Sequence, residues 1–270
     1  MFQADRLWAA ASACFVIAAA GLAHLRIIDR RVLSGENVWS KPLKFALAFP
    51  MHLATLAVAS HFLPSELKDQ AWLRNSALIS IGAAFFEFGY IAFQAARRRR
   101  SHFNTETSFE RVMYGLMGLG SVLVVAPSVL IGITAAFVPR IAWEPCVRWA
   151  VAVSFVAGAA LTLLTGFQMG SLKSHFAVDC RRGRKMPLTG WSLTGDDVRP
   201  FHFLAVHMMQ VIPVVAIVAS LVVPRPAANA VVAITSVGWT WLTLQTLHIQ
   251  TRVGRRQRTA SRGSVNSRVS

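Results

Sequence analysis

The stretch MYGLMGLGSVLVVAPSVLIGITAAFV at 113–138 contains no charged side chain. A helix that crosses the hydrocarbon core of a bilayer needs about 20 apolar residues in succession, because the core is about 30 Å thick and a helix rises about 1.5 Å per residue. Backbone N–H and C=O groups find no water inside lipid, and a helix pairs these groups internally. The stretch therefore predicts a transmembrane helix.

Six more apolar stretches of similar length accompany it. They run approximately over 7–25, 43–63, 75–96, 148–170, 202–223 and 229–250. The composition agrees, because 54% of the 270 residues are hydrophobic and only 15% are charged. We therefore expect an all-α fold, a polytopic membrane helix bundle of seven transmembrane helices over residues 1–251. The Ser- and Arg-rich stretch 252–270 shows no periodicity, so we expect a basic, disordered tail there.

The formal charge of +16 raises the question of a nucleic-acid partner. The basic residues flank the apolar stretches instead of forming one contact face, so the sequence predicts no nucleic-acid binding. Of the 28 Lys and Arg residues, 22 lie in the first, third and fifth connections and in the tail. The positive-inside rule then places the N-terminus outside and the C-terminus in the cytoplasm. The tail would attract anionic lipid headgroups at the cytoplasmic face.

Two pairs of short motifs hint at an internal repeat. KPLKF at 41–45 resembles RPFHF at 199–203, and YIAFQ at 90–94 resembles WLTLQ at 241–245. The matches fit a parallel 3+1+3 duplication in which the first three spans correspond to the last three. Chance recurrence, and the preference of proline for helix starts, are the alternative. A duplication would place these residues opposite one another around a cytoplasm-facing cleft: Lys41 and Arg199, Lys44 and His202, Gln94 and Gln245.

One charged residue, Glu87, lies deep in a predicted span, and an acid within a membrane is a functional candidate. Counted from the cytoplasmic ends, Glu87 lies about 14 Å deep, His52 about 15 Å, Gln210 about 13 Å and His207 about 8 Å. We expect these groups to meet near the midplane. The alternative is that each simply hydrogen-bonds a neighbouring helix. The predicted ligand or proton site comprises His52, Glu87, Gln94, His207, Gln210 and Gln245.

A second group of polar residues lies at the cytoplasmic ends of the spans. Its basic members would attract an anion, and Asp196 or Asp197 would cap the sixth span. The four arginines at 97–100 fit a stop signal for translocation. The predicted cytoplasmic polar rim comprises Lys41, Lys44, His102, Asn104, Asp197, Arg199 and His202.

Motifs for metals, nucleotides and retinal are missing from the sequence. There is no HExxH, no CxxC, no Walker loop and no GxGxxG before a helix, and no lysine lies in the interior of a span. We therefore predict no metal site, leave the cofactor unassigned, and favour a non-catalytic function. Haem b or a metal ion stays open as the alternative, because His52 and His207 could provide two imidazoles on facing helices.

Three segments carry a resemblance to a known family. NVWSKPLKF at 37–45, QAARRRRSHFN at 94–104 and GWSLTGDDVRPFHFLAVHMMQVIP at 190–213 resemble motifs of a family of bacterial seven-span integral membrane proteins without an established activity. Asp196 stands where that family has a glycine. The resemblance implies a multi-pass protein of the bacterial inner membrane. The motif positions that it implies are Trp39, Lys41, Lys44, Gln94, Ser101, His102, Asn104, Asp197, Arg199, His202, His207 and Gln210.

These observations lead to one functional hypothesis and two rivals. We expect small-solute transport or ligand binding through the cytoplasm-facing polar cleft, with Glu87 and a histidine binding or relaying a proton. The first rival is a membrane-embedded haem- or metal-dependent oxidoreductase that uses His52, His102, His202 or His207. The second is a non-catalytic sensor or assembly factor that acts through the tail.

Overall fold

The computed structural model describes residues 3–138, 141, 143–172, 186, 190–191 and 197–266, with side chains through residue 245. Within these residues, seven helices are long and apolar enough to cross a membrane. Each of them contains or overlaps one of the seven predicted apolar stretches. The chain is therefore a multi-pass integral membrane protein with an all-α bundle, as the sequence predicts.

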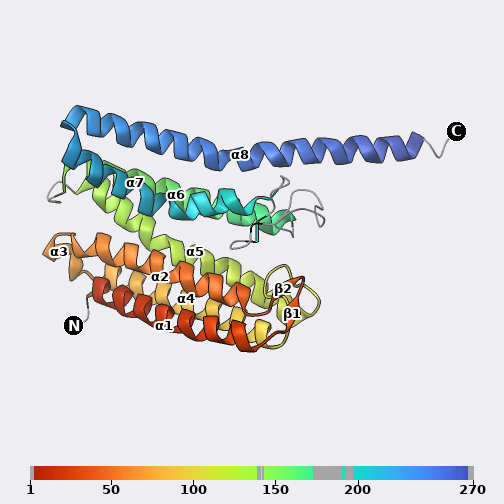
Figure 1. The fold of residues 1–270 in the computed structure, drawn as a ribbon. Helices are drawn as coiled ribbons and strands as arrows, with labels where there is room; N and C mark the ends of the chain where they lie inside the picture. Colours follow the sequence, from red (N-terminus) through yellow and green to blue (C-terminus); the bar gives the residue numbers. More distant parts are fainter. Residues whose placement is uncertain are drawn as a thin grey trace. The chain divides into compact units, whose positions relative to one another are not determined.

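Two of the connections between the long helices contain short elements of their own (Figure 1). A one-turn helix, α3 (Ser65–Lys68), joins α2 to α4, and two short strands, β1 (Val32–Leu33) and β2 (Glu36–Asn37), join α1 to α2. The long helices are α1 (Ala4–Ile28), α2 (Ser40–His61), α4 (Ala71–Ala96), α5 (Ser108–Phe137), α6 (Pro145–Leu172), α7 (Arg199–Val222) and α8 (Arg225–Asn266).

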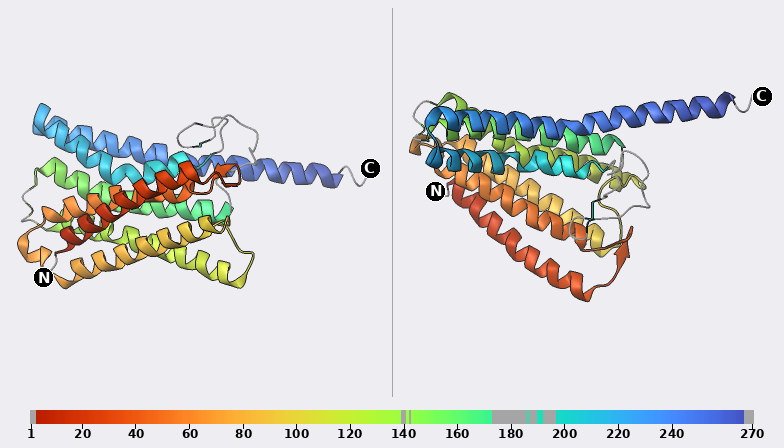
Figure 2. Two further views of the ribbon diagram at one scale, coloured as in Figure 1. Left: turned by 60° about the horizontal axis from the view of Figure 1, so that its bottom comes forward. Right: turned by 45° about the horizontal axis from the view of Figure 1, so that its top comes forward.

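Helix α8 differs from the expectation for the tail. Residues 252–266, which we expected to be disordered, continue α8 as one long helix (Figure 2), and residues 267–270 lie outside the described residues. Arg, Gln and Ala are good helix formers. A helix that a membrane span has already nucleated gains one hydrogen bond for each residue added. Hydrophobic periodicity is not needed for such an extension, so its absence over 252–270 does not exclude a helix there.

The chain forms two compact units, Met1–Val156 and Ala157–Ser270, which we call the first and the second unit. In the first unit α1, α2 and α4 pack together, and α4 also packs along α5 (Figure 1). Phe15 of α1 stacks on Phe85 with ring centroids 4.6 Å apart and contacts Phe49 of α2 at 5.1 Å. The indole N–H of Trp8 donates to Ser80 Oγ at 3.0 Å in the interior. Aromatic stacking and one buried polar contact thus hold α1 to its neighbours.

The contact between α5 and α6 is close because Gly132 has no side chain. A Cβ at this position would lie 2.9 Å from the Val156 side chain. The guanidinium of Arg148 then closes the end of α5, donating to Ala135 O at 2.6 Å and to Ala136 O at 2.8 Å. The last carbonyls of a helix have no partner within it, so Arg148 satisfies two of them.

In the second unit α7 contacts both α6 and α8. A Cβ at Gly158 of α6 would lie 3.3 Å from the Cβ of Met208 in α7. The indole N–H of Trp239 in α8 donates to Leu204 O in α7 at 2.7 Å, and α7 and α8 run side by side (Figure 1). A glycine and a half-buried indole therefore set the helix spacing, as is common where lipid gives no hydrophobic drive for association.

The connection between α1 and α2, residues 29–39, is held by a tight turn and by hydrogen bonds of Asp29 and Arg31; we call it the latch. Ser34 (φ 54°) and Gly35 (φ 84°) form the two-residue turn between β1 and β2, a turn type that needs positive φ at both positions. Asp29 accepts the indole N–H of Trp39 at 2.7 Å and binds the guanidinium of Arg31. Arg31 also donates to Ala96 O, the end of α4, at 2.8 Å. The hydrogen bonds from Arg31 hold the pKa of Asp29 well below its usual value.

Candidate functional site

Glu87 lies in the interior of the first unit, against a glycine of the neighbouring helix. Its side chain is 4% exposed, and Oε1 has no hydrogen-bond partner among the described residues. A Cβ built at Gly120 of α5 would lie 2.7 Å from that oxygen. Gly120 therefore provides the space that the carboxyl occupies.

Lys41, at the start of α2, is the charged residue whose field acts on the Glu87 carboxyl. Among the described ion pairs none joins the two side chains directly, so the attraction acts over a distance longer than an ion-pair contact. Lys44, three residues further along α2, is exposed and pairs with Glu36 at 3.2 Å. Of the two lysines predicted for the rim, the structure brings Lys41 toward the buried acid and leaves Lys44 at the surface.

His52 is buried in the same unit but has a different partner. Its Nε2–H donates to the backbone carbonyl of Val124 in α5 at 3.0 Å, which links α2 to α5. No contact between His52 and Glu87 is present among the described hydrogen bonds. The position of His52 thus fits the alternative in which a polar residue simply bonds a neighbouring helix.

Gln94 belongs to a buried polar cluster that sequence reasoning missed. Its Nε2 donates to the hydroxyl of Tyr90 at 2.8 Å, and its side chain is close to Glu110 of α5. Glu110 is 1% exposed, accepts from Thr107 Oγ1 at 3.1 Å and pairs with Arg99 at 3.1 Å. The backbone N–H of Glu110 in turn bonds Thr107 Oγ1 at 3.2 Å.

The sequence does contain the signal for Glu110. Thr107-Ser-Phe-Glu110 is a capping box, in which a threonine and a glutamate three residues later satisfy the first N–H groups of a helix. The apolar stretch begins only at residue 113, so a search for apolar stretches places Glu110 outside the span. The cap starts the helix ahead of the apolar stretch, and Glu110 lies buried in its first turn.

His102 and Asn104 shape the connection between α4 and α5. Asn104 is 4% exposed, donates to Arg100 O at 3.1 Å and accepts the N–H of Glu106 at 3.2 Å. His102 contacts Ser101 Oγ through Nδ1 at 3.2 Å, and its ring lies 5.8 Å from that of Phe45. These contacts order the loop. They place Asn104 inside it instead of on an open rim.

His202 lies in the second unit, against α6. Thr165 Oγ1 donates to Leu161 O at 2.8 Å, so it accepts from His202 Nδ1–H at 2.8 Å. The hydrogen bond fixes the ring with its Nε2 as the acceptor nitrogen. His202 therefore has a defined orientation at the start of α7.

His207 and Gln210 form a pair on α7, as their spacing of three residues predicts. The Gln210 side chain hydrogen-bonds the His207 ring. The ring centroid of His207 also lies 4.1 Å from that of Phe203, one turn earlier. In α8, by contrast, Gln245 donates to Trp241 O of its own helix at 3.2 Å.

Asp197 and Arg199 form the start of α7. Asp197 is 5% exposed and accepts the N–H of Arg199 at 3.1 Å, which is the capping role expected of it. It also pairs with the guanidinium of Arg199 at 2.7 Å, and that guanidinium donates to Gly190 O at 2.7 Å. Asp196 lies outside the described residues.

The predicted site residues are divided between the two units. Lys41, His52, Glu87 and Gln94 lie in the first unit, and His202, His207, Gln210 and Gln245 lie in the second. Within a unit the structure brings together Glu87 with Lys41 and His207 with Gln210. The meeting of all these groups at one cleft stays a prediction, as do the three facing pairs of the suggested repeat.

The donor atoms of the histidines bear on the haem and metal alternative. The described residues contain no group of three or more His, Cys, Asp or Glu side chains placed to hold a metal ion. His52 uses Nε2 for Val124 O, and His202 uses Nδ1 for Thr165. His52 would have to break a buried hydrogen bond before its Nε2 could bind iron, so this arrangement does not favour the alternative. No protein-family model, no curated protein and no solved structure matches the chain.

Proposed function

We propose that the chain binds or transports a small solute across the membrane and that Glu87 exchanges a proton in the process. The observation that carries the proposal is the buried Glu87 carboxyl, whose Oε1 has no hydrogen-bond partner among the described residues and lies against Gly120. An ionised group in a membrane interior is expensive to keep and is found mainly on substrate or proton pathways.

Glu110 is the internal comparison that favours function over structure. Both glutamates are buried on the α4–α5 pair, and in both Oε1 has no hydrogen bond among the described residues. Glu110, however, accepts from Thr107 and Arg99 at Oε2, and its Oε1 lies 3.1 Å from the Arg99 guanidinium. A glutamate kept for structure alone is expected to be satisfied in this way, because an unpaired buried polar group destabilises the fold. Glu87 has only the more distant charge of Lys41.

Lys41 suggests the class of solute. Lys41 lies at a helix start and has no direct ion pair among the described residues, so it can attract an anion. When Glu87 is protonated, its attraction to Lys41 is lost and the lysine can pair with the anion instead. Arg199, its counterpart in the suggested repeat, is already held by Asp197. We therefore infer a small anionic solute taken up or released together with a proton.

The topology of the proposed transporter follows the charge distribution. The bias of Lys and Arg places the N-terminus outside, the C-terminus in the cytoplasm and Lys41 at the cytoplasmic side. The proposal also includes a parallel 3+1+3 duplication and a cytoplasm-facing cleft with His202, His207 and Gln210. It further includes membership of the bacterial inner-membrane family. The similar starts of α2 and α7, each a basic residue followed by proline, support the duplication.

The test is a flux measurement in proteoliposomes that enclose a pH-sensitive dye. A panel of small organic anions and neutral polar solutes is added outside, and the internal pH is followed. We expect at least one anion to change the internal pH through the wild-type protein. Glu87→Gln should abolish the pH change, and Lys41→Met should weaken it.

Two matched variants control for general damage. Glu66→Gln removes an exposed glutamate of α3, and Lys44→Met removes the exposed lysine of α2; both should keep wild-type coupling. If Glu87→Gln shows the same solute-driven pH change as the wild type, Glu87 does not carry the proton.

A further inference from the structure

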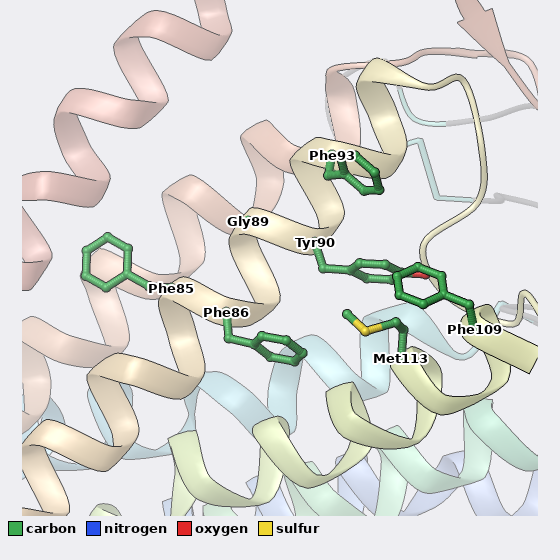
Figure 3. Close-up of a pocket in the computed structure, with 7 residues that line it drawn as sticks. All are labelled: Phe85, Phe86, Gly89, Tyr90, Phe93, Phe109 and Met113. Atoms are coloured by element: carbon green, nitrogen blue, oxygen red, sulfur yellow. The ribbon is translucent and has the colours of Figure 1, made fainter.

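An apolar groove of about 400 Å³ lies between α4 and α5 on the outer surface of the first unit (Figure 3). Gly89, Tyr90 and Met113 line it together with four phenylalanines: Phe85, Phe86 and Phe93 on α4 and Phe109 on α5. None of these residues belongs to the predicted ligand site. We call this feature the phenylalanine groove.

The walls of the groove are exposed although they are aromatic. Phe86 is 39% exposed, Phe93 49% and Phe109 55%. Both helices are candidate membrane spans, so acyl chains and not water surround these rings. The hydrophobic surface of the groove is therefore compatible with occupation by hydrocarbon.

Gly89 gives the groove its depth. A Cβ at this position meets no atom within 4 Å, so a side chain there would extend into open space. Tyr90, 5% exposed, lies next to it and points its hydroxyl toward Gln94. A water molecule occupies about 30 Å³ of liquid, and a methylene group is similar in size, so the groove holds roughly a dozen methylenes.

Arg97 lies at the end of the groove. Its guanidinium carbon is 5.0 Å from the centroid of the Phe93 ring, a cation–π contact. Among the described residues no carboxylate pairs with Arg97, whereas Arg99 two residues later pairs with both Glu106 and Glu110. From Phe85 to Arg97 α4 rises about 18 Å, which is about the depth of one leaflet with its headgroup.

We propose that the phenylalanine groove is a binding site for one anionic phospholipid. An acyl chain lies along the phenylalanine rings and over Gly89, and the phosphate pairs with Arg97. The groove matches an acyl chain in its length and in its apolar walls within two membrane spans. The cation at one end matches the phosphate of the headgroup. The site is independent of proton exchange at Glu87.

The experiment uses the full-length protein and two photoactivatable lipids with the same acyl chains, a phosphatidylglycerol and a phosphatidylcholine. After reconstitution and cross-linking, labelled peptides are identified by mass spectrometry. We expect phosphatidylglycerol to label the segments 85–93 and 109–113 more than the other spans. Arg97→Gln should lower the preference over phosphatidylcholine about fivefold, the factor for one basic residue near an anionic headgroup.

Gly89→Leu tests the groove itself and should lower the labelling of both segments, by either lipid, to the level of the other spans. Gly82→Leu is the matched control, because Gly82 lies seven residues earlier on the same helix, also has open space around its Cβ and does not line the groove. Even labelling of all spans, or a lipid preference that Arg97→Gln leaves unchanged, would mean ordinary contact with bulk lipid and would overturn the proposal. A lipid-free dimer that Gly89→Leu disrupts would assign the groove to a second copy instead.

Discussion

Glu87 and Glu110 lie on neighbouring helices, and both are buried, but their surroundings differ. Glu110 has a hydroxyl and a guanidinium in contact with its carboxylate, whereas Glu87 Oε1 has a glycine in front of it. A carboxyl that is already bonded resists a change of protonation, since the change breaks its bonds. The residue-level difference therefore separates a structural acid from a candidate proton carrier.

Glu87 should be visible by infrared spectroscopy. A protonated carboxyl has a C=O stretch that a carboxylate lacks, so we expect this band to appear or disappear when the pH is changed. Protonation of Glu87 at Oε1 breaks no hydrogen bond among the described residues. The band should be absent from Glu87→Gln and present in Glu110→Gln. A band that persists in Glu87→Gln would assign the signal to another acid.

Gly120→Ala should destabilise the first unit. The added methyl would lie 2.7 Å from Glu87 Oε1, and overpacking of this kind costs about 1–3 kcal/mol. Thermal unfolding in detergent measures the effect. Gly118→Ala is the control, because a Cβ there meets nothing within 4 Å. In the double variant with Glu87→Ala the cost of Gly120→Ala should largely disappear, and an unchanged cost would locate the clash elsewhere.

The pKa of Asp29 predicts a pH dependence for the latch between α1 and α2. The hydrogen bonds from Arg31 lower the pKa of Asp29 in the folded protein below the unfolded value of 3.8. The stabilisation is therefore fully present above about pH 4 and is lost as the pH falls through the folded pKa.

The check is the thermal stability of the wild type and of Asp29→Asn between pH 7 and pH 3 in the same detergent. We expect the variant to be less stable at neutral pH and the difference to shrink toward acid. A difference that stays constant down to pH 3 would contradict the role of the Asp29 charge. Asp69→Asn, at an exposed carboxylate that accepts from Gln3, is the control.

At the scale of elements, polar residues at the helix ends decide where a helix begins and ends, and hydropathy does not detect them. α5 starts five residues before its apolar stretch because the Thr107 hydroxyl accepts the backbone N–H of Glu110 and the Glu110 carboxylate accepts from that hydroxyl. The opposite end of α5 is closed by Arg148 from α6. The length of a span thus depends on polar residues that a search for apolar stretches excludes.

Thr107→Ala should lower the free energy of unfolding by about 1 kcal/mol, the usual cost of losing an N-cap side chain. The measurement is unfolding in detergent with increasing denaturant. Thr134→Ala provides the control, since the Thr134 hydroxyl bonds only Leu130 O of its own helix at an exposed position. An equal loss in both variants would show that the cap contributes nothing beyond a helix hydroxyl.

At the scale of the whole molecule, the orientation in the membrane is a prediction from charge. Lys and Arg gather in the first, third and fifth connections and in the tail, so the C-terminus should be cytoplasmic. A fluorescent protein fused after Ser270 should be fluorescent, and an alkaline phosphatase fused there should be inactive. The opposite pair of results would reverse the topology and move Lys41 to the outer side.

The groups that surround Glu87 belong to different spans, so the sequence alone could not identify them. The spacing along α4 predicts that Glu87 faces the interior, and its burial agrees with this. Neither Gly120 nor Lys41 has a fixed distance to Glu87 in the sequence. Which of two lysines three residues apart turns toward the acid depends on the rotation of α2, and packing against α1 and α4 sets that rotation.

The sequence by itself determined the class of fold. The length of a span is set by the thickness of hydrocarbon and by the need to pair the backbone, and both are properties of a continuous stretch of residues. Only the tertiary structure decided the contacts between separate elements: Gly120 against Glu87, Arg99 on Glu110, Val124 O on His52, and the phenylalanine groove between α4 and α5. Each of these joins residues from separate helices or loops. In lipid, such contacts follow from close packing and hydrogen bonding, which no hydropathy pattern encodes.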